Sequence, residues 1–366
     1  MVALSTSPAR ALAQHKAVAI WLFVVALLIA AMIVIGGLTR LTGSGLSITE
    51  WKPVTGAIPP LSDSAWAAEF AKYQRIPQFR LENPTMDVAG FKAIYWWEWT
   101  HRLLGRLLGF AFLLPFLYFA ATGAIAREGY PRMIALFALG GLQGFVGWWM
   151  VESGLETRVS VSQYRLAIHL GVALILFGAI IWTALDYWSK PDARKPSAAG
   201  GELFRWASAF AVLVYLQMLL GALVAGLHAG LIYNTWPSMD GRLFPEHPFS
   251  HQPWWVNFGE SPGLAQFDHR IGAYIIAISA FALWTAGRRA KLSGSARAGS
   301  NAVLAVTGFQ IVLGIATLLN QAPVALAALH QVTAAALFAA AIWHAQSLST
   351  GSPGIRPRPV PVPNPR

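Results

Sequence analysis

Four of the nine histidines lie in or beside long apolar stretches of the chain and form two similar pairs, His101 with His169 and His269 with His330. Neutral imidazole ligates heme iron, zinc or copper. Two imidazoles on facing helices can bind a planar heme iron from both sides, whereas zinc prefers three or four ligands close together. The two pairs therefore favour two heme-sized sites over a zinc site.

The other five histidines lie in predicted loops, near predicted helix ends or close to the C-terminal tail. We expect them to be solvated or interfacial: His15, His228, His247, His251 and His344. A single histidine on an apolar helix is more often hydrogen-bonded to a neighbour than a ligand. Two matching pairs at one depth are different, because an ionisable residue inside a membrane segment indicates function.

The polar residues beside the two pairs differ in one place. Glu98 stands three residues before His101, and Gln266 stands three residues before His269. Residues i and i+3 share a helix face, so the first pair has a carboxylate beside it and the second an amide. We expect the first half to do chemistry with Glu98 as proton acceptor or charge stabiliser, and the second to hold a permanent heme. The alternative for Glu98 is a rim charge paired with Arg102.

Arg102 directly follows His101, and Arg270 directly follows His269, at the outer rim of the predicted bundles. Heme propionates would emerge at this rim, and guanidinium groups pair well with carboxylates. Both arginines are therefore candidates for propionate contacts, with interfacial anchoring as the alternative reading.

Eight apolar runs position these residues, and each is long enough for a spanning helix of about 20 residues. They cover 17–37, 102–122, 133–151, 166–187, 204–227, 270–287, 302–320 and 325–346. The first run is too long for a cleaved signal peptide and has no small-x-small cleavage pattern after it. Only 12% of the residues are charged, about half the roughly 25% of soluble domains. This composition argues against a disordered chain and against an ordinary soluble enzyme.

The net charge of +11 lies on one side of the predicted spans, the side of both termini and the even-numbered loops. By the positive-inside rule, both termini are cytoplasmic in a multi-pass protein of the bacterial inner membrane. Anionic membrane lipid can add to this bias. Basic residues scattered between apolar runs make no patch for nucleic acid, so we expect no such partner. The chain has no cysteine, which excludes disulfides, thiolate metal sites and covalently attached c-type heme.

The two halves of the chain resemble each other in sequence. Matched positions recur in order: Gly36 with Gly221, Gly45 with Gly230, Trp51 with Trp236, Gly56 with Gly241, Pro60 with Pro245, His101 with His269, Gln143 with Gln310, Gly147 with Gly314, and His169 with His330. Each repeat holds four spans, an even number, so both halves share one orientation. We predict an all-α integral membrane protein of two parallel four-helix bundles, related by a pseudo-twofold axis along the membrane normal.

Five segments follow from this repeat. They are a cytoplasmic N-terminus (1–16), an N-terminal four-helix repeat (17–187), a cytoplasmic linker (188–203), a C-terminal four-helix repeat (204–346) and a cytoplasmic tail rich in Pro and Arg (347–366).

Specific motifs resemble the heme A synthases over about residues 17–346. They are GGLTRLTGSGLSITEWKPVTGAIPP (36–60), EWTHRLLGR (98–106), FDHR (267–270) and ALHQ (328–331). The resemblance implies a heme-dependent oxidoreductase that converts the C8 methyl group of heme O to a formyl group by successive hydroxylations, giving heme A for cytochrome oxidase. The absence of cysteine places the chain with a cysteine-free branch, typical of proteobacteria and similar to the mitochondrial proteins.

The resemblance also implies roles for the residues. The second half binds heme b with His269 and His330 as axial ligands of the iron and with Arg270 nearby. The first half takes heme O near His101 and His169, and the catalytic residues are Glu98, His101 and His169. Contacts of Arg102 and Arg40 with the propionates of the substrate complete this expectation.

The partners implied are heme O synthase, the farnesyltransferase that makes the substrate, and cytochrome oxidase assembly factors; a homo-oligomer stays open. Two other classes compete with the enzyme. A di-heme b electron carrier linked to quinone explains four histidines but not the difference between Glu98 and Gln266. A transporter or heme-handling chaperone explains the repeat, but transporters show broken helices and a polar site at the midplane.

Overall fold

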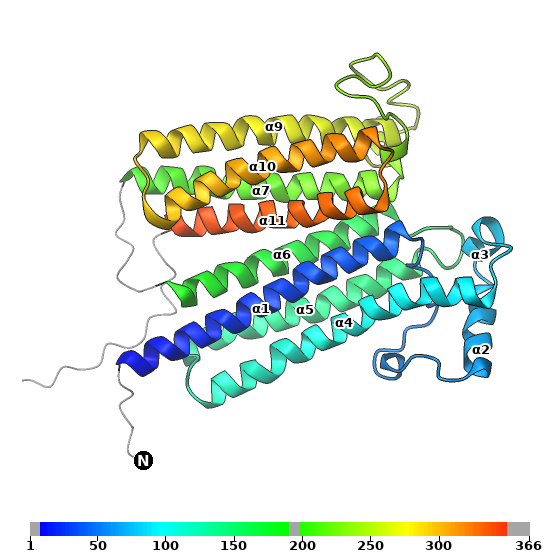
Figure 1. The fold of residues 1–366 in the computed structure, drawn as a ribbon, viewed down its shortest axis with the longest axis horizontal. Helices are drawn as coiled ribbons and strands as arrows, with labels where there is room; N and C mark the ends of the chain where they lie inside the picture. Colours follow the sequence, from blue (N-terminus) through cyan, green and yellow to red (C-terminus); the bar gives the residue numbers. More distant parts are fainter. Residues whose placement is uncertain (1–7, 190–197, 350–366) are drawn as a thin grey trace, which may run out of the picture.

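A computed structural model describes residues 8–189 and 198–349 of the chain, and within them eight helices are long and apolar enough to cross a membrane. These helices lie side by side (Figure 1). They are α1 (Pro8–Leu41), α4 (Val88–Ala121), α5 (Tyr130–Glu152), α6 (Gln163–Trp188), α7 (Ala198–Gly226), α9 (Pro262–Arg289), α10 (Gly294–Leu319) and α11 (Val324–Leu348). The prediction of an all-α, multi-pass membrane protein with eight spanning helices is confirmed.

Shorter helices lie in the connections between the long ones. They are η1 (Thr55–Ala57), α2 (Asp63–Tyr73), α3 (Pro77–Glu82), η2 (Arg127–Gly129), η4 (Ala229–Leu231), η5 (Trp254–Val256) and α8 (Asn257–Glu260). Local sequence starts two of them: the Ser62 side chain accepts from Ala65 N at the beginning of α2, and Pro77 opens α3. Helices α2 and α3 lie beyond one end of the long helices, away from the first turns of α1 (Figure 1).

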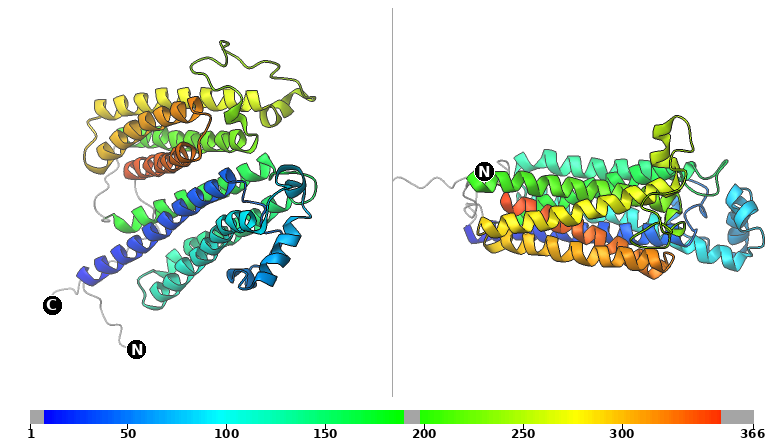
Figure 2. Two further views of the ribbon diagram at one scale, coloured as in Figure 1. Left: turned by 45° about the vertical axis from the view of Figure 1, so that its right-hand side comes forward. Right: turned by 90° about the horizontal axis from the view of Figure 1, so that it is seen from above.

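The long helices pack as two groups of four, α1 with α4, α5 and α6, and α7 with α9, α10 and α11 (Figure 2). Each packed pair in one group has its counterpart in the other: α1 packs on α4 and α6 as α7 packs on α9 and α11. Between the groups, α1 contacts α11 and α6 contacts α7, again a matched pair. These pairings agree with the repeat read from the sequence, and the twofold axis itself stays a prediction.

The largest hydrophobic core lies where the two groups meet. Fully buried side chains from α1 and α6, such as Leu22, Leu174 and Ile180, belong to it together with residues of α7 and α11. Other apolar residues are exposed instead, for example Phe110 at 59% and Ile278 at 71%. A helix that is apolar on its exposed side as well as its packed side is typical of a membrane span.

A polar contact between α11 and α1 also joins the two groups. Gln331 Nε2 on α11 donates a hydrogen bond to the Ile33 carbonyl oxygen on α1 at 2.6 Å. The glutamine fits because residue 37 of α1 is glycine, and a Cβ there would overlap the Gln331 side chain. Close packing and a hydrogen bond, rather than apolar burial alone, hold helices together in lipid.

Several helices are longer than the apolar runs that predicted them. Helix α4 begins at Val88 rather than at 102, and α9 begins at Pro262 rather than at 270. The added turns of α4 carry Lys92, Glu98 and several tryptophans, which lower the hydropathy without opposing a helix. With 34 residues, α4 is about 51 Å long, which exceeds the roughly 30 Å hydrocarbon core. Similarly, α1 extends into the predicted N-terminal segment 1–16, α7 into the predicted linker 188–203 and α11 into the predicted tail 347–366. Parts of these three segments lie outside the described residues.

The projecting part of α4 carries a second, separate hydrophobic core. Residues Phe91 and Tyr95 of α4 pack there with buried side chains from the preceding connection, namely Leu46, Trp66, Phe70, Tyr73 and Ile76. We call residues 42–87 the α2–α3 cap. The cap covers the end of the first helix group.

The expectation for His344 is wrong. Its side chain is 1% exposed in α11, where we expected solvation or an interface. Gly299 of α10 explains the burial, because a Cβ there would lie only 3.2 Å from the Cβ of His344. The absence of a side chain lets the two helices approach closely in this last part of α11.

Candidate functional site

The four paired histidines have the same local setting. Each imidazole lies against a glycine on a neighbouring helix of its own group, and a Cβ on that glycine would lie 2.9–3.2 Å from the imidazole Cε1. The contacts are Gly36 (α1) with His101 (α4), Gly147 (α5) with His169 (α6), Gly221 (α7) with His269 (α9), and Gly314 (α10) with His330 (α11). Alanine is too large at these positions, so the four glycines hold the rings at a fixed distance from the neighbouring backbone.

The two histidines of the second group face each other across the bundle. The ring centroids of His269 and His330 are 6.5 Å apart, and the ring planes cross at 76°. Two metal–nitrogen bonds of about 2.0–2.1 Å in line would put the nitrogen atoms roughly 4 Å apart, which suits rings at this separation. His330 Nδ1 is buried without a hydrogen-bond partner. These features fit a metal atom between two imidazoles.

The donor set speaks against a metal ion bound by side chains alone. In the part of the chain that the structure describes, no group of three or more His, Cys, Asp or Glu could hold a metal ion. Two imidazoles are enough for heme, since the porphyrin supplies the other four nitrogens. The residues present therefore fit a heme between His269 and His330.

Glutamines hold three of the four histidines. Gln143, Gln217 and Gln310 each stand four residues before one of the contacting glycines. Their Nε2 atoms donate to the backbone oxygens of His169, His269 and His330 at 3.1, 2.7 and 3.0 Å. Each Nε2 also lies 3.1–3.3 Å from a nitrogen of the same ring. The repeat matched Gln143 with Gln310, but we assigned them no role, and Gln217 was missed.

Glu98 lies one turn before His101 and is 3% exposed. Its carboxylate accepts three hydrogen bonds: from Ser47 Oγ at 2.8 Å, from Ile48 N at 2.8 Å and from Arg102 Nη2 at 2.5 Å. The ion pair with Arg102, which we gave as the alternative for Glu98, is present. Because Glu98 is buried, however, it is no rim charge, and all three donors face an ionised carboxylate.

The second group repeats this arrangement with one polarity reversed. Arg270 Nη2 donates to Gln266 Oε1 at 2.9 Å, as Arg102 does to Glu98. Gln266 Nε2 instead donates to the Ala229 carbonyl oxygen at 2.7 Å. The loop after α1 thus presents donors to Glu98, whereas the loop after α7 presents an acceptor to Gln266. The difference between carboxylate and amide is built into both the helix and the loop beside it.

Both arginines of the predicted rim hold loop backbone. Arg102 donates to the carbonyl oxygens of Ile48 and Glu50 at 2.7 and 2.9 Å. Arg270 donates to those of Tyr233 and Ser238 at 2.9 and 3.1 Å. These bonds are to loop backbone, and both the propionate contact and anchoring at the membrane interface stay predictions. Arg270 Nε remains buried and without a partner among the described residues, so it still offers a donor.

Arg40 lies in the last turn of α1, half-buried, and no described residue forms a hydrogen bond or ion pair with its guanidinium. Its charge acts on His228, which lies just after α7: burial lowers the pKa of His228, and the positive charge of Arg40 lowers it further. The guanidinium is therefore available for an anionic group.

Charged residues of the α2–α3 cap fix the backbone that Arg102 binds. Lys72 contacts the carboxylates of Glu50 and Glu69, each at 2.8 Å, and Lys52 pairs with Glu50 at 2.5 Å. Hydrogen bonds from Lys52 and Lys72 lower the pKa of the Glu50 carboxyl. The cluster holds residue 50 beside α2, so that its carbonyl oxygen faces Arg102.

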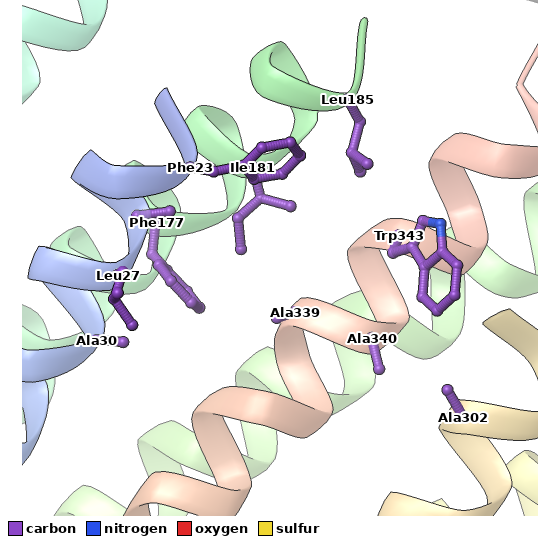
Figure 3. Close-up of a pocket in the computed structure, with 11 residues that line it drawn as sticks. Phe23, Leu27, Ala30, Phe177, Ile181, Leu185, Ala302, Ala339, Ala340 and Trp343 are labelled. Carbon is purple, nitrogen blue, oxygen red and sulfur yellow. The ribbon is translucent and has the colours of Figure 1, made fainter. Parts of the chain in front are cut away.

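An apolar groove of about 480 Å³ lies between the two helix groups (Figure 3). Its lining includes Phe23 and Leu27 of α1, Phe177 of α6 and Trp343 of α11. Leu27 precedes Gly36 by nine residues, which is about 13 Å along a helix, so the groove is distant from the histidines. No acid, base or metal ligand lines it, and it cannot be the reaction site.

The fold and the site define a class: a multi-pass helical membrane protein with two pairs of histidines, one inside each group of four helices. Residues 19–342 match the family model described as cytochrome oxidase assembly protein. The chain belongs to this family.

Several relatives that are similar over most of the chain carry the name heme A synthase. A protein of Parvibaculum lavamentivorans is 50% identical over 338 residues, which are 92% of this chain and 96% of the relative. One of Rhodopseudomonas palustris strain HaA2 is 48% identical over 95% of this chain and 94% of its own length. One of Caulobacter vibrioides is 49% identical over 90% and 95%.

Proposed function

We propose that this chain carries out the heme A synthase reaction: it oxidises the C8 methyl group of heme O to a formyl group by successive hydroxylations, giving heme A for cytochrome oxidase. The names of relatives at about 50% identity support this activity. The observation that carries the assignment of residues is the difference between Glu98, held by three donors, and Gln266.

The second group of helices holds the cofactor in this proposal. His269 and His330 would hold the iron of heme b, and the 6.5 Å between their ring centroids supports this role. Heme b would supply electron transfer to the oxidation. Arg270 keeps the loop over this site closed through Tyr233 and Ser238, and its free Nε can bind a propionate.

The first group binds the substrate. His101 and His169 ligate the iron of heme O, and Arg40 binds a propionate with its unpartnered guanidinium. Arg102 acts by holding Glu98 and the loop carbonyl oxygens. Any contact of Arg102 with the substrate uses the N–H groups that these bonds leave free. Glu98 presents a fixed negative charge, which stabilises positive charge that develops as electrons leave the methyl carbon.

The first group also offers more room along its helices, which supports placing the bulkier, farnesylated heme there. At four positions it has glycine where the second group has a larger residue: Gly105 against Ala273, Gly109 against Ala277, Gly140 against Thr307, and Gly144 against Ile311. A Cβ on Gly109 or Gly144 would meet no atom within 4 Å. Added volume is therefore available beside His101 and His169.

The cellular setting follows from the same reading. Both termini lie in the cytoplasm and the α2–α3 cap on the opposite side of the inner membrane, since the basic residues gather on the side of the termini. Heme O is poorly soluble, so direct transfer from heme O synthase would help, and heme A would pass on to cytochrome oxidase assembly factors.

The test is a heme extraction. The chain is expressed with a heme O synthase in a host that lacks heme A, and acid–acetone extracts are separated by reversed-phase chromatography with mass detection. We expect heme A or its hydroxylated precursor. Heme b and unaltered heme O alone, from a folded and heme-loaded protein, would refute the proposal and favour the di-heme electron carrier.

A further inference from the structure

The four histidines share a glycine contact but not a glutamine. Three of them are held by Gln143, Gln217 and Gln310, each four residues before the contacting glycine. For His101 the contacting glycine is Gly36, and the residue four positions before it is Met32. Met32 occupies the repeat position of Gln217, because Gly36 matches Gly221 at the same offset.

Met32 cannot replace the missing hydrogen bond. A thioether has no donor, so it can hold neither the His101 carbonyl oxygen nor its ring. The terminal methyl of Met32 instead lies 3.6 Å from the Cβ position of Gly105 on α4. Among the described residues, no side chain forms a hydrogen bond with the His101 ring or its carbonyl oxygen, so none fixes the rotation of this ring. His101 Nδ1 is buried without a partner, as His330 Nδ1 is, but His330 has Gln310 beside its other ring nitrogen.

A second difference accompanies the first. Gln217 needs glycine at residue 272 of α9, since a Cβ there would overlap the Gln217 amide oxygen. The matching position on α4, three residues after His101, is Leu104. The His101 site therefore lacks both the glutamine and the space for it. A concerted change at two contacting positions on two helices indicates a distinct design of the His101 site.

The hydrogen bond to a metal-ligating histidine orients the ring and strengthens it as a ligand, and its loss typically weakens metal binding by roughly 10–100-fold. We propose that Met32 and Leu104 make His101 the releasable ligand of the first site. Heme then exchanges between the first site and the membrane, while two glutamine-held ligands keep heme in the second site. The inference rests on the proposed function in taking the first site as the one that must admit substrate and release product.

Reciprocal exchange of the matched residues tests this proposal. The full-length chain in detergent is loaded with heme b, and heme transfer to excess apomyoglobin is followed in the Soret band. His169→Ala identifies the phase of the first site. We expect Gln217→Met to speed release from the second site roughly 10–100-fold, with the first site unchanged. We expect Met32→Gln with Leu104→Gly to slow release from the first site similarly, with the second site unchanged.

Two controls separate ligand strength from general damage. The low-spin electron paramagnetic resonance signal of the unaltered site should stay the same in each variant, whereas a loosened bundle would change both sites. If the wild-type chain keeps only one heme b through purification, the double variant should keep two.

Unchanged release from the second site of Gln217→Met would overturn the proposal, even where the double variant does not fold. So would a folded double variant that releases heme as fast as the wild type. Failure of the enzyme assignment is a separate result, because it would show as an absence of formyl heme with the release rates as expected.

Discussion

Replacing Glu98 with glutamine removes the charge from the first site while keeping the shape of the side chain. The amide oxygen can still accept from Arg102, as Gln266 does from Arg270. The amide nitrogen then faces Ser47 Oγ and Ile48 N, which both donate to the carboxylate in the wild type. The Ser47 hydroxyl can rotate and accept, but the Ile48 N–H is left without an acceptor.

The size of the effect follows from these bonds. A buried donor without an acceptor costs about 1–3 kcal/mol, and a hydrogen bond to a charged group contributes about 1.5–3 kcal/mol. Loss of one group that stabilises developing charge costs about 2.7–4 kcal/mol, or roughly 10²–10³ in kcat. We therefore expect heme A formation in Glu98→Gln to fall by roughly 10²–10³, while heme b stays bound by His269 and His330.

The assay is quantitative heme analysis, with the heme b spectrum of the purified protein as a measure of folding. Ser47→Ala is the graded control: it removes one neutral donor from Glu98 but keeps the charge. A hydrogen bond to a charged group contributes about 1.5–3 kcal/mol, so a loss of at most roughly 10–150-fold is expected. Normal heme A output from Glu98→Gln would refute the charge role. Parallel loss of heme b and activity would show a structural role instead.

Three further predictions use other parts of the structure. His269→Ala or His330→Ala loses the tightly held heme with its six-coordinate spectrum; an unchanged spectrum would contradict the ligand assignment. Gly144→Ile introduces the residue that the second group has at the matching position, and it blocks heme A formation but keeps heme b. The matched Ile311→Gly keeps activity; equal activity of both variants would contradict the proposal that the first group has the space for heme O. Two lysines lower the pKa of Glu50, so its stabilisation of the cap is present above the unfolded pKa and declines as pH falls through the lowered value; hydrogen exchange of residues 48–52 should rise there, and a flat profile would contradict this.

The sequence predicted the spans and the histidine pairs because both leave periodic signals. Hydropathy locates apolar turns, but it missed the first turns of α4, where Lys92, Glu98 and several tryptophans lower the mean hydropathy. The prediction for His344 failed for a related reason. Its burial depends on Gly299 of another helix, and the sequence around His344 does not show which residue packs against it.

The polar contacts of the site were harder to predict than its ligands. Nothing in the spacing of Ser47 and Glu98 shows that the two meet, since they are 51 residues apart and joined through the folded cap. The glutamines could have been found, because Gln217 and Gln310 each precede a contacting glycine by four residues. Comparing the repeats position by position would also have singled out Met32.

The separate core of the α2–α3 cap sets an order of events in biogenesis. Phe91 and Tyr95, which complete this core, are synthesised after the cap and belong to the next span. Ser47 and Ile48 can reach Glu98 only once α4 has packed beside α1 and the cap has folded onto α4. A nascent chain that has made α1 but not α4 therefore has no assembled carboxylate site.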